Sequence, residues 1–318
     1  MFAILCPGQG AQSPGFLSPW LELPGVAEQL ATLSEVAGVD LAVHGTTSDA
    51  ETIKDTAIAQ PLIVAAGLIA ARALLGEQLL TSANPSALAA GHSVGEITAS
   101  AVTGVLSEHE AMRFVRERAN NMALAAAVTP TGMSAVVGGN PAEVRAAIEA
   151  AGLTPANVNS SGQTVAAGTL EQLAVLAENP PAKARVIPLQ VAGAFHTRHM
   201  APAVGALEAL QPELNPKDPA VTLLSNYDGA PVTSGGAALQ SLIAQVSRPV
   251  RWDLCMETMT SLGVNALIEL SPAGTLTGLM KRAIPGVATV AVKTPADLDT
   301  ARELIANDAS VEASEGEQ

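Results

Sequence analysis

Ala87-Leu88-Ala89-Ala90-Gly91-His92-Ser93-Val94-Gly95 is the stretch on which the fold prediction rests. Its first four residues are apolar, as expected of a short strand, and residues 96–102 are predicted to be helical. A strand, Gly-x-Ser-x-Gly and a helix in this order are typical of a nucleophile elbow, a sharp turn that lifts a serine hydroxyl to the N-terminus of the next helix. The pattern therefore predicts an α/β fold with Ser93 as nucleophile. A chance match is the alternative, because Gly, Ser and Ala are abundant.

Composition and length agree with that fold class. Of the 318 residues, 48% are hydrophobic and 2% aromatic, a balance that suits helices on a parallel sheet better than a β-sandwich. The apolar residues 61–75 fall short of a membrane span and are predicted to form a buried helix. The N-terminus is not typical of a signal peptide, and Cys6 and Cys255 lie far apart. We therefore expect a cytoplasmic protein without a disulfide and without membrane association.

The charge and the motifs exclude several function classes. A formal net charge of −14 argues against non-specific nucleic-acid binding, although Arg248, Arg251, Lys281 and Arg282 are candidates for a local basic patch. The sequence has no Walker loop, no spaced Cys/His zinc cluster and no complete dinucleotide fingerprint. We therefore expect no cofactor and no metal.

The remaining patterns predict a large domain with a smaller insert. Residues 132–191 have the order β-α-β-β-α-β of a ferredoxin-like unit, whose ends lie close together and permit insertion. We expect residues 128–195 to be this inserted subdomain. Residues 1–127 and 196–306 then form an α/β-hydrolase-like catalytic domain with a central, mostly parallel sheet. The acidic residues 307–318 are expected to be a disordered tail.

A serine nucleophile needs a base, and His196 is the best candidate because it follows the insert, where the chain re-enters the large domain. His199 is the second choice. His92 is adjacent to Ser93 and should point away from it, and His109 and His44 are expected in a solvated first helical turn and a polar loop. A packed loop histidine is the structural alternative for His196.

The acid of a hydrolase triad is missing from its expected place. Residues 94–195 contain no aspartate, and their glutamates fall mostly on predicted helices. A Ser–His dyad whose imidazole is oriented by a backbone carbonyl fits better, and this favours an enzyme other than a lipase.

Arg118 lies on the apolar stripe of the helix that Ser107 and Glu110 cap, whereas Arg113 and Arg116 lie on its polar face. A buried guanidinium must be paired, either with an internal glutamate or with a substrate carboxylate. Position alone leaves both open.

The turn after the first predicted strand contains Gln9. Its N–H groups could stabilise an oxyanion together with the N–H of Val94, because sites in open α/β sheets gather at the carboxyl ends of strands. A plain turn is the alternative.

Together these residues resemble the malonyl-CoA:acyl-carrier-protein transacylases of bacterial type II fatty-acid synthesis, which are related to polyketide-synthase acyltransferase domains. The resemblance spans residues 1–293. It is carried, in order, by Pro7-Gly8-Gln9-Gly10-Ala11-Gln12, Gly91-His92-Ser93-Val94-Gly95-Glu96, Arg118, Asn159-Ser160-Ser161-Gly162-Gln163 and Phe195-His196. It implies malonyl-CoA and holo acyl carrier protein as partners, and no nucleic acid.

The resemblance also implies roles for these residues. Ser93 would carry the malonyl ester, with His196 as general base and then acid, and Arg118 would bind the malonyl carboxylate. Gln9 and Val94 would supply oxyanion N–H groups, and Asn159 and His92 would line the substrate site. Phe195 would disfavour an α-methyl group, and residues 55–60 also resemble the malonyl-selective type. The family's histidine is oriented by a carbonyl near residues 248–252, where relatives often carry Gln at the position of Arg251.

Two other function classes remain open at this stage. A serine esterase or thioesterase would release the acyl group to water instead of to a carrier protein. A non-catalytic binding module would keep its function after Ser93→Ala.

Overall fold

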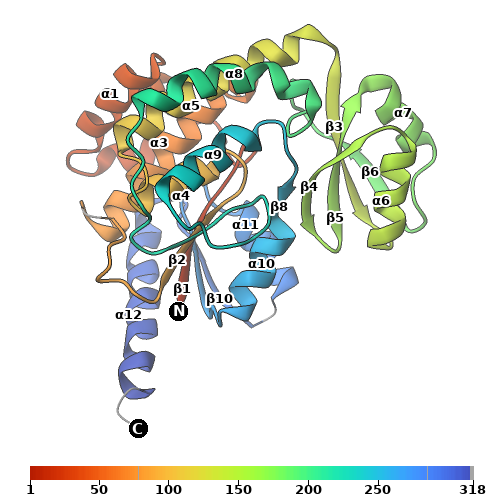
Figure 1. Ribbon diagram of the computed structural model, residues 1–318. Helices are drawn as coiled ribbons and strands as arrows, with labels where there is room; N and C mark the ends of the chain where they lie inside the picture. The colour runs from red at the N-terminus through yellow and green to blue at the C-terminus, as the bar shows by residue number, and fades with distance from the viewer. Residues whose placement is uncertain (78, 285, 316–318) are drawn as a thin grey trace.

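Two five-stranded sheets organise the chain in this computed structural model, which describes the backbone of residues 1–77, 79–284 and 286–315 (Figure 1). The first sheet has the order β10-β9-β1-β2-β7, and all of its strands are parallel. Its strands are β1 (Phe2–Cys6), β2 (Ala87–Gly91), β7 (Thr222–Leu224), β9 (Ala266–Glu269) and β10 (Ala288–Ala291). The predicted central parallel sheet is confirmed.

Helices cover both faces of this sheet, as a parallel sheet requires. One face is covered by α1 (Val26–Ala37), α2 (Leu41–Thr46), α3 (Thr56–Leu75), α4 (Gly95–Val102), α5 (Glu108–Val128), α8 (Ala201–Leu210), α9 (Gly235–Gln245) and the start of α12 (Leu298–Glu315). The other face is covered by α10 (Trp252–Ser261) and α11 (Thr275–Ala283). Short 3-10 turns η1 to η5 lie at Ser18–Glu22, Thr52–Lys54, Arg198–Met200, Gln211–Glu213 and Pro295–Asp297.

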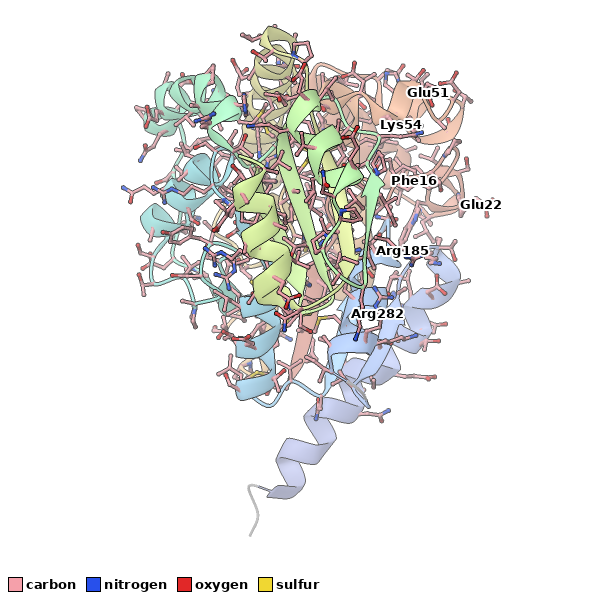
Figure 2. All side chains as sticks on the ribbon, turned by 90° about the vertical axis from the view of Figure 1, so that its right-hand side faces the viewer. Phe16, Glu22, Glu51, Lys54, Arg185 and Arg282 are labelled. Carbon is pink, nitrogen blue, oxygen red and sulfur yellow. The ribbon has the colours of Figure 1, made fainter. Side chains whose placement is uncertain are left out.

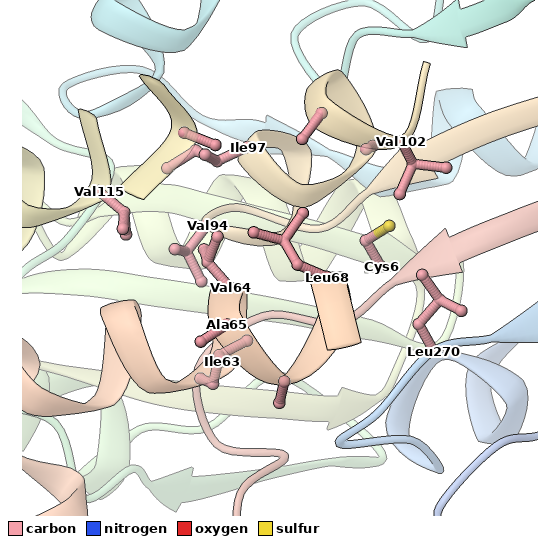
Figure 3. Close-up of a cluster of buried hydrophobic side chains, with 14 of the residues drawn as sticks. Cys6, Ile63, Val64, Ala65, Leu68, Val94, Ile97, Val102, Val115 and Leu270 are labelled. Atoms are coloured by element: carbon pink, nitrogen blue, oxygen red, sulfur yellow. The ribbon is translucent and has the colours of Figure 1, made fainter. Parts of the chain in front are cut away.

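Successive side chains of β1 point to opposite faces of the sheet, so this strand contributes to the hydrophobic core on each face. Phe2, Ile4 and Cys6 pack into the cluster on the α3 side, whereas Ala3 and Leu5 pack into the cluster with α10 and α11. Figure 3 shows the α3-side core at its centre, where side chains of α3 lie close to those that follow the elbow.

The predicted buried helix is the long core helix α3. It begins at Thr56, earlier than the predicted residue 61, because Asp55 caps it by accepting a hydrogen bond from the Ala57 N–H. Among the described helices it is the one that is long and apolar enough to cross a membrane, and 78% of its most apolar window is buried inside the protein. Its hydrophobicity therefore serves the core.

The second sheet has the order β6-β3-β5-β4-β8. Its first four strands are β3 (Thr131–Gly138), β4 (Thr154–Ser160), β5 (Gln163–Thr169) and β6 (Ala184–Pro188), with helices α6 (Pro141–Ala150) and α7 (Leu170–Glu178) between them. This is the predicted ferredoxin-like order, with antiparallel pairing and a separate small core. β8 (Val250–Arg251), from outside the insert, pairs in parallel with β4 and ties the second sheet to the rest of the molecule.

The C-terminal region differs from its prediction. We expected residues 307–318 to be disordered, but the backbone of α12 is helical as far as Glu315. The local reason is that alanine and glutamate, frequent in this stretch, are good helix formers. Residues 316–318 of the predicted tail lie outside the described residues.

Candidate active site

Ser93 lies in the strained turn between β2 and α4. Its φ is +54°, in the left-handed region that residues other than glycine rarely adopt. The flanking glycines make the turn possible. A Cβ on Gly91 would lie 2.1 Å from the carbonyl carbon of Gly95, and one on Gly95 would lie 2.1 Å from the Cys6 carbonyl oxygen. This is the backbone geometry predicted for a nucleophile elbow.

His196 meets this turn. Ser93 Oγ lies 2.7 Å from His196 Nε2, and His196 Nδ1 lies 2.8 Å from the backbone carbonyl oxygen of Gln245. Because a carbonyl oxygen can only accept, Nδ1 carries the proton and Nε2 presents its lone pair to the Ser93 hydroxyl. The orienting group is thus a backbone carbonyl, at Gln245, three residues before the 248–252 segment.

The surroundings of His196 keep its imidazole neutral. Burial, followed by the nearby Arg118 cation, lowers the pKa of His196 from 6.5 to about 3. Its side chain is buried, and its backbone N–H also donates to the Val246 carbonyl. A neutral imidazole with a free Nε2 lone pair can accept a proton from Ser93 at neutral pH.

Arg118 is buried on α5, as its place on the apolar stripe predicted. Nη1 donates to Gln60 Oε1 at 2.6 Å and Nη2 donates to Gln245 Oε1 at 2.8 Å, with Nη2 also 3.4 Å from Ser93 Oγ. Within the described part of the chain no carboxylate forms an ion pair with it, and its Nε has no partner. Burial lowers the pKa of Arg118 to about 10, so the guanidinium stays charged at pH 7. A cation with neutral partners beside a nucleophile is suited to an anionic ligand.

His92 points away from Ser93, as predicted, and connects the elbow to the second sheet. Its Nε2 lies 2.8 Å from Asn159 Oδ1, and Asn159 Nδ2 donates to Gln163 Oε1 at 3.0 Å. The ring packs edge-on against Trp252 with 5.8 Å between ring centroids. Burial lowers the pKa of His92, so this imidazole is also neutral. The contact positions β4 directly over the elbow.

A cavity of about 260 Å³ opens in front of Ser93, between the two sheets. The predicted site residues that line it are Gln9, His92, Ser93, Val94, Asn159, Phe195 and His196. Arg118 is not part of this wall but reaches Ser93 from behind it. The fold therefore brings together all eight residues to which the family resemblance assigns a role.

Apolar side chains and one cation complete the cavity. Met122, Met133 and Leu279 contribute apolar surface, and Arg282 contributes a positive charge from α11. Figure 2 shows Arg282 below the second sheet in that view. Arg251, in contrast, is engaged with Asp253 through two hydrogen bonds of 2.9 and 2.8 Å. The cavity therefore offers both apolar surface and a positive charge to a short acyl group and the chain that carries it.

The other histidines take no part in the cavity wall. His44 was expected in a polar loop, but it lies in α2, where Nδ1 contacts Ser48 Oγ at 2.9 Å. The Asp40 cap, whose side chain accepts from the Val43 N–H, starts a helix that the loop prediction overlooked. His109 lies in the first turn of α5 as predicted, and His199 lies in η3.

The roles of three buried polar residues were not predicted from the sequence. Gln60 and Gln245 hold Arg118, and Glu96 Oε2 accepts a 2.6 Å hydrogen bond from Gln245 Nε2. Glu96 follows the elbow directly and Gln60 lies in a mostly apolar helix, so a polar residue in an apolar context was the available signal. Gln245 had no comparable signal, because its partners are distant in sequence.

The chain is similar to known proteins over most of its length. The family described as "Acyl transferase domain" matches residues 3–304. The malonyl CoA-acyl carrier protein transacylase of Mycobacterium tuberculosis is 53% identical over 299 residues, covering 94% of this chain and 98% of that protein. The protein of the same name from Salmonella typhimurium is 32% identical over 308 residues, covering 94% and 98%.

Solved structures give the same result. The crystal structure of MCAT from Mycobacterium tuberculosis has a TM-score of 0.91 at 52% identity and covers 95% of this chain and 99% of that one. A malonyl-transacylase in complex with its type II PKS acyl-carrier protein has a TM-score of 0.88 at 31% identity, covering 95% and 99%. The chain belongs to the malonyl CoA-acyl carrier protein transacylase family of acyl transferases.

Proposed function

We propose that this protein transfers the malonyl group from malonyl-CoA to the phosphopantetheine thiol of an acyl carrier protein, supplying extender units for fatty-acid or polyketide synthesis. The observation that carries the proposal is that a histidine base and an arginine cation both lie next to the hydroxyl oxygen of Ser93. Ser93 Oγ lies 2.7 Å from His196 Nε2 and 3.4 Å from Arg118 Nη2. A hydroxyl beside a neutral base and a buried cation suits acyl transfer from a substrate with a carboxylate.

In the first half-reaction, Ser93 Oγ attacks the thioester carbonyl while His196 Nε2 takes the hydroxyl proton. The resulting oxyanion is held by the backbone N–H groups of Gln9 and Val94, which line the cavity. The carbon–sulfur bond then breaks, and the imidazolium returns its proton to the leaving CoA sulfur. Ser93 is left as a malonyl ester whose carboxylate is bound by Arg118.

The second half-reaction reverses these steps with the carrier thiol. His196 takes the thiol proton, the sulfur attacks the ester carbonyl, and the proton returns to Ser93 Oγ as the thioester forms. No acid residue is needed, because the Gln245 carbonyl keeps Nδ1 protonated throughout. The scheme is a ping-pong exchange with no net consumption of protons.

The pocket residues define which acyl group fits. Phe195 is buried and lines the cavity, where we propose that it narrows the pocket against an α-methyl group, and Asn159 and His92 form the polar wall. One methyl group changes binding by about 1–3 kcal/mol, so we propose a preference for malonyl over methylmalonyl rather than absolute exclusion.

We further propose that residues 1–127 and 196–306 act as the catalytic domain and that residues 128–195 are an inserted ferredoxin-like subdomain, which forms one wall of the cavity. The second sheet contributes Asn159 and Gln163 to the cavity, which supports this division. We also propose a cytoplasmic location, supported by two buried free thiols, Cys6 and Cys255.

The competing function is a serine hydrolase, and partition of the acyl-enzyme separates the two. The protein is loaded with radiolabelled malonyl-CoA, freed of excess substrate, and mixed either with holo acyl carrier protein or with buffer. Label that moves to the carrier protein within one turnover and is stable in buffer supports transfer. Label released to water at the same rate in both samples contradicts it.

A further inference from the structure

Glu96 is a buried carboxylate that the transfer mechanism does not use. It lies in the first turn of α4 and is 2% exposed. Its Oε2 accepts from Gln245 Nε2 at 2.6 Å, and the Ser225 side chain and the Asn226 backbone also hydrogen-bond to its carboxylate. A carboxylate that is this buried normally ion-pairs or binds a cation. The described residues offer Glu96 no such direct partner.

The amide of Gln245 separates Glu96 from Arg118. Gln245 Oε1 accepts from Arg118 Nη2 at 2.8 Å while the same amide's Nε2 donates to Glu96. The two buried charges thus lie at opposite ends of one side-chain amide, and each influences the protonation of the other. Because both groups are buried in the low-dielectric interior, their charges interact far more strongly than they would at the same distance in water.

We propose that Glu96 is a positioning residue that sets how tightly Arg118 binds the malonyl carboxylate, because it is the internal counter-charge of that guanidinium. The inference rests on the proposed function. Ionised Glu96 partly cancels the positive field that attracts the substrate carboxylate. Neutral Glu96 leaves that field intact while Gln245 stays hydrogen-bonded. The binding of acyl groups that carry no carboxylate does not depend on whether Glu96 is ionised.

Glu96 titrates near neutral pH. Burial raises the pKa of Glu96 to about 7, opposed by the Gln245, Ser225 and Asn226 hydrogen bonds and by the Arg118 charge. Raising the pH through 7 therefore adds a negative charge behind Arg118, and malonyl binding weakens. The linkage is reciprocal, so a bound malonyl carboxylate favours the protonated form of Glu96 and raises its pKa further.

The neighbouring ionisable groups do not change charge in that pH range. The elements packed against α4 are α3, α5, α9, β1 and β2, and they bring Arg118 and Cys6 near Glu96. The pKa is about 10 for Arg118 and about 3 for His196, it is lowered for His92, and burial raises it for Cys6 and Cys255. Glu96 is therefore the local group that switches between pH 6 and pH 8.

The test compares the rate of single-turnover acylation of Ser93 by malonyl-CoA with that by acetyl-CoA, from pH 6 to 8.5. The ratio cancels ionisations of CoA and of His196, which both substrates share. For the unaltered protein we expect the malonyl-to-acetyl ratio to fall roughly three- to tenfold as the pH rises. Glu96→Gln should hold the ratio at its low-pH value across the range, since the amide retains an acceptor for Gln245 but carries no charge.

Glu269→Gln is the matched control. Glu269 is equally buried, but its carboxylate accepts from the Leu276 and Thr277 N–H groups at the start of α11, away from Arg118. Its ratio should follow the pH dependence of the unaltered protein. A pH-independent ratio in the unaltered protein overturns the proposal even if Glu96→Gln does not fold. An equal loss of malonyl and acetyl acylation in folded Glu96→Gln also overturns it. Absence of malonyl acylation at every pH would instead contradict the proposed function.

Discussion

His196 donates its Nδ1–H to the backbone carbonyl of Gln245 over 2.8 Å, so the main chain orients the base in place of a carboxylate. A carbonyl fixes the tautomer but adds no negative charge beside the imidazole. The strongly lowered pKa of His196 is consistent with this arrangement, since burial and Arg118 act on it without an opposing anion. The proposed mechanism thus starts from a histidine that is neutral at physiological pH and carries a proton only transiently during transfer.

Removal of this base should slow acylation much more than substrate binding. We expect His196→Ala to reduce the single-turnover rate of Ser93 acylation by roughly 10²–10⁴-fold, the usual contribution of a general base, while the Kd for malonyl-CoA changes little. Stopped-flow acylation and equilibrium binding measure the two quantities separately. His199→Ala is the control. A comparable loss of acylation rate in that variant would contradict the assignment of the general base to His196.

Acid should destabilise the fold through His196. In the unfolded chain its pKa is about 6.5, whereas in the folded protein burial holds it at about 3. Between pH 6.5 and pH 3 the unfolded state binds a proton at this histidine and the folded state does not. The free energy of unfolding therefore decreases as the pH falls through this range, by up to about 5 kcal/mol. Urea unfolding at pH 7 and pH 4.5 should show a smaller loss for His196→Gln than for the unaltered protein. Equal losses would mean that the imidazole is not buried neutral.

Arg118 should determine selectivity for a carboxylate. Arg118→Ala removes the cation behind Ser93, and we expect kcat/KM for malonyl-CoA to drop about 100-fold or more, with acetyl-CoA affected only a few-fold. Arg113→Ala is the control, because Arg113 lies on the same helix but pairs with Glu213 at the surface. An equal decrease in kcat/KM for malonyl-CoA and acetyl-CoA would indicate that Arg118 has only a structural role.

Phe195 should restrict the acyl pocket. Phe195→Ser opens space next to His196, and we expect the methylmalonyl-to-malonyl ratio of kcat/KM to increase about tenfold, in line with one methyl group in a pocket. Competition between the two thioesters, read by mass spectrometry of the loaded carrier protein, measures the ratio directly. Comparable transfer of both thioesters by the unaltered protein would refute the predicted malonyl preference.

The parts of this protein that the sequence predicted well are those with local causes. β1 is a short apolar strand ended by Pro7, the elbow needs two glycines around Ser93, and α5 starts at a capping box formed by Ser107 and Glu110. The position of Arg118 on an apolar helical face also predicted its burial. Each of these signals lies within a few residues, where the chemistry of the chain decides the conformation.

The parts that could not be predicted depend on contacts between distant segments. Gln245 ends α9, yet it bonds to His196, Arg118, Glu96 and the Ser93 carbonyl. Nothing in the residues around it indicates these partners, because they meet only after α9 packs against α4. The helices α10 and α11 were likewise missed, although Leu279 and Arg282 of α11 line the cavity.

The most direct test of the account is to locate the malonyl ester. The protein is mixed with malonyl-CoA without carrier protein, quenched in acid, digested and analysed by peptide mass spectrometry. We predict one malonyl adduct, on Ser93 in the peptide that contains Gly91 and Gly95, with no adduct in Ser93→Ala and full discharge on addition of holo acyl carrier protein. An adduct on another residue, or malonyl transfer retained by Ser93→Ala, would contradict the account.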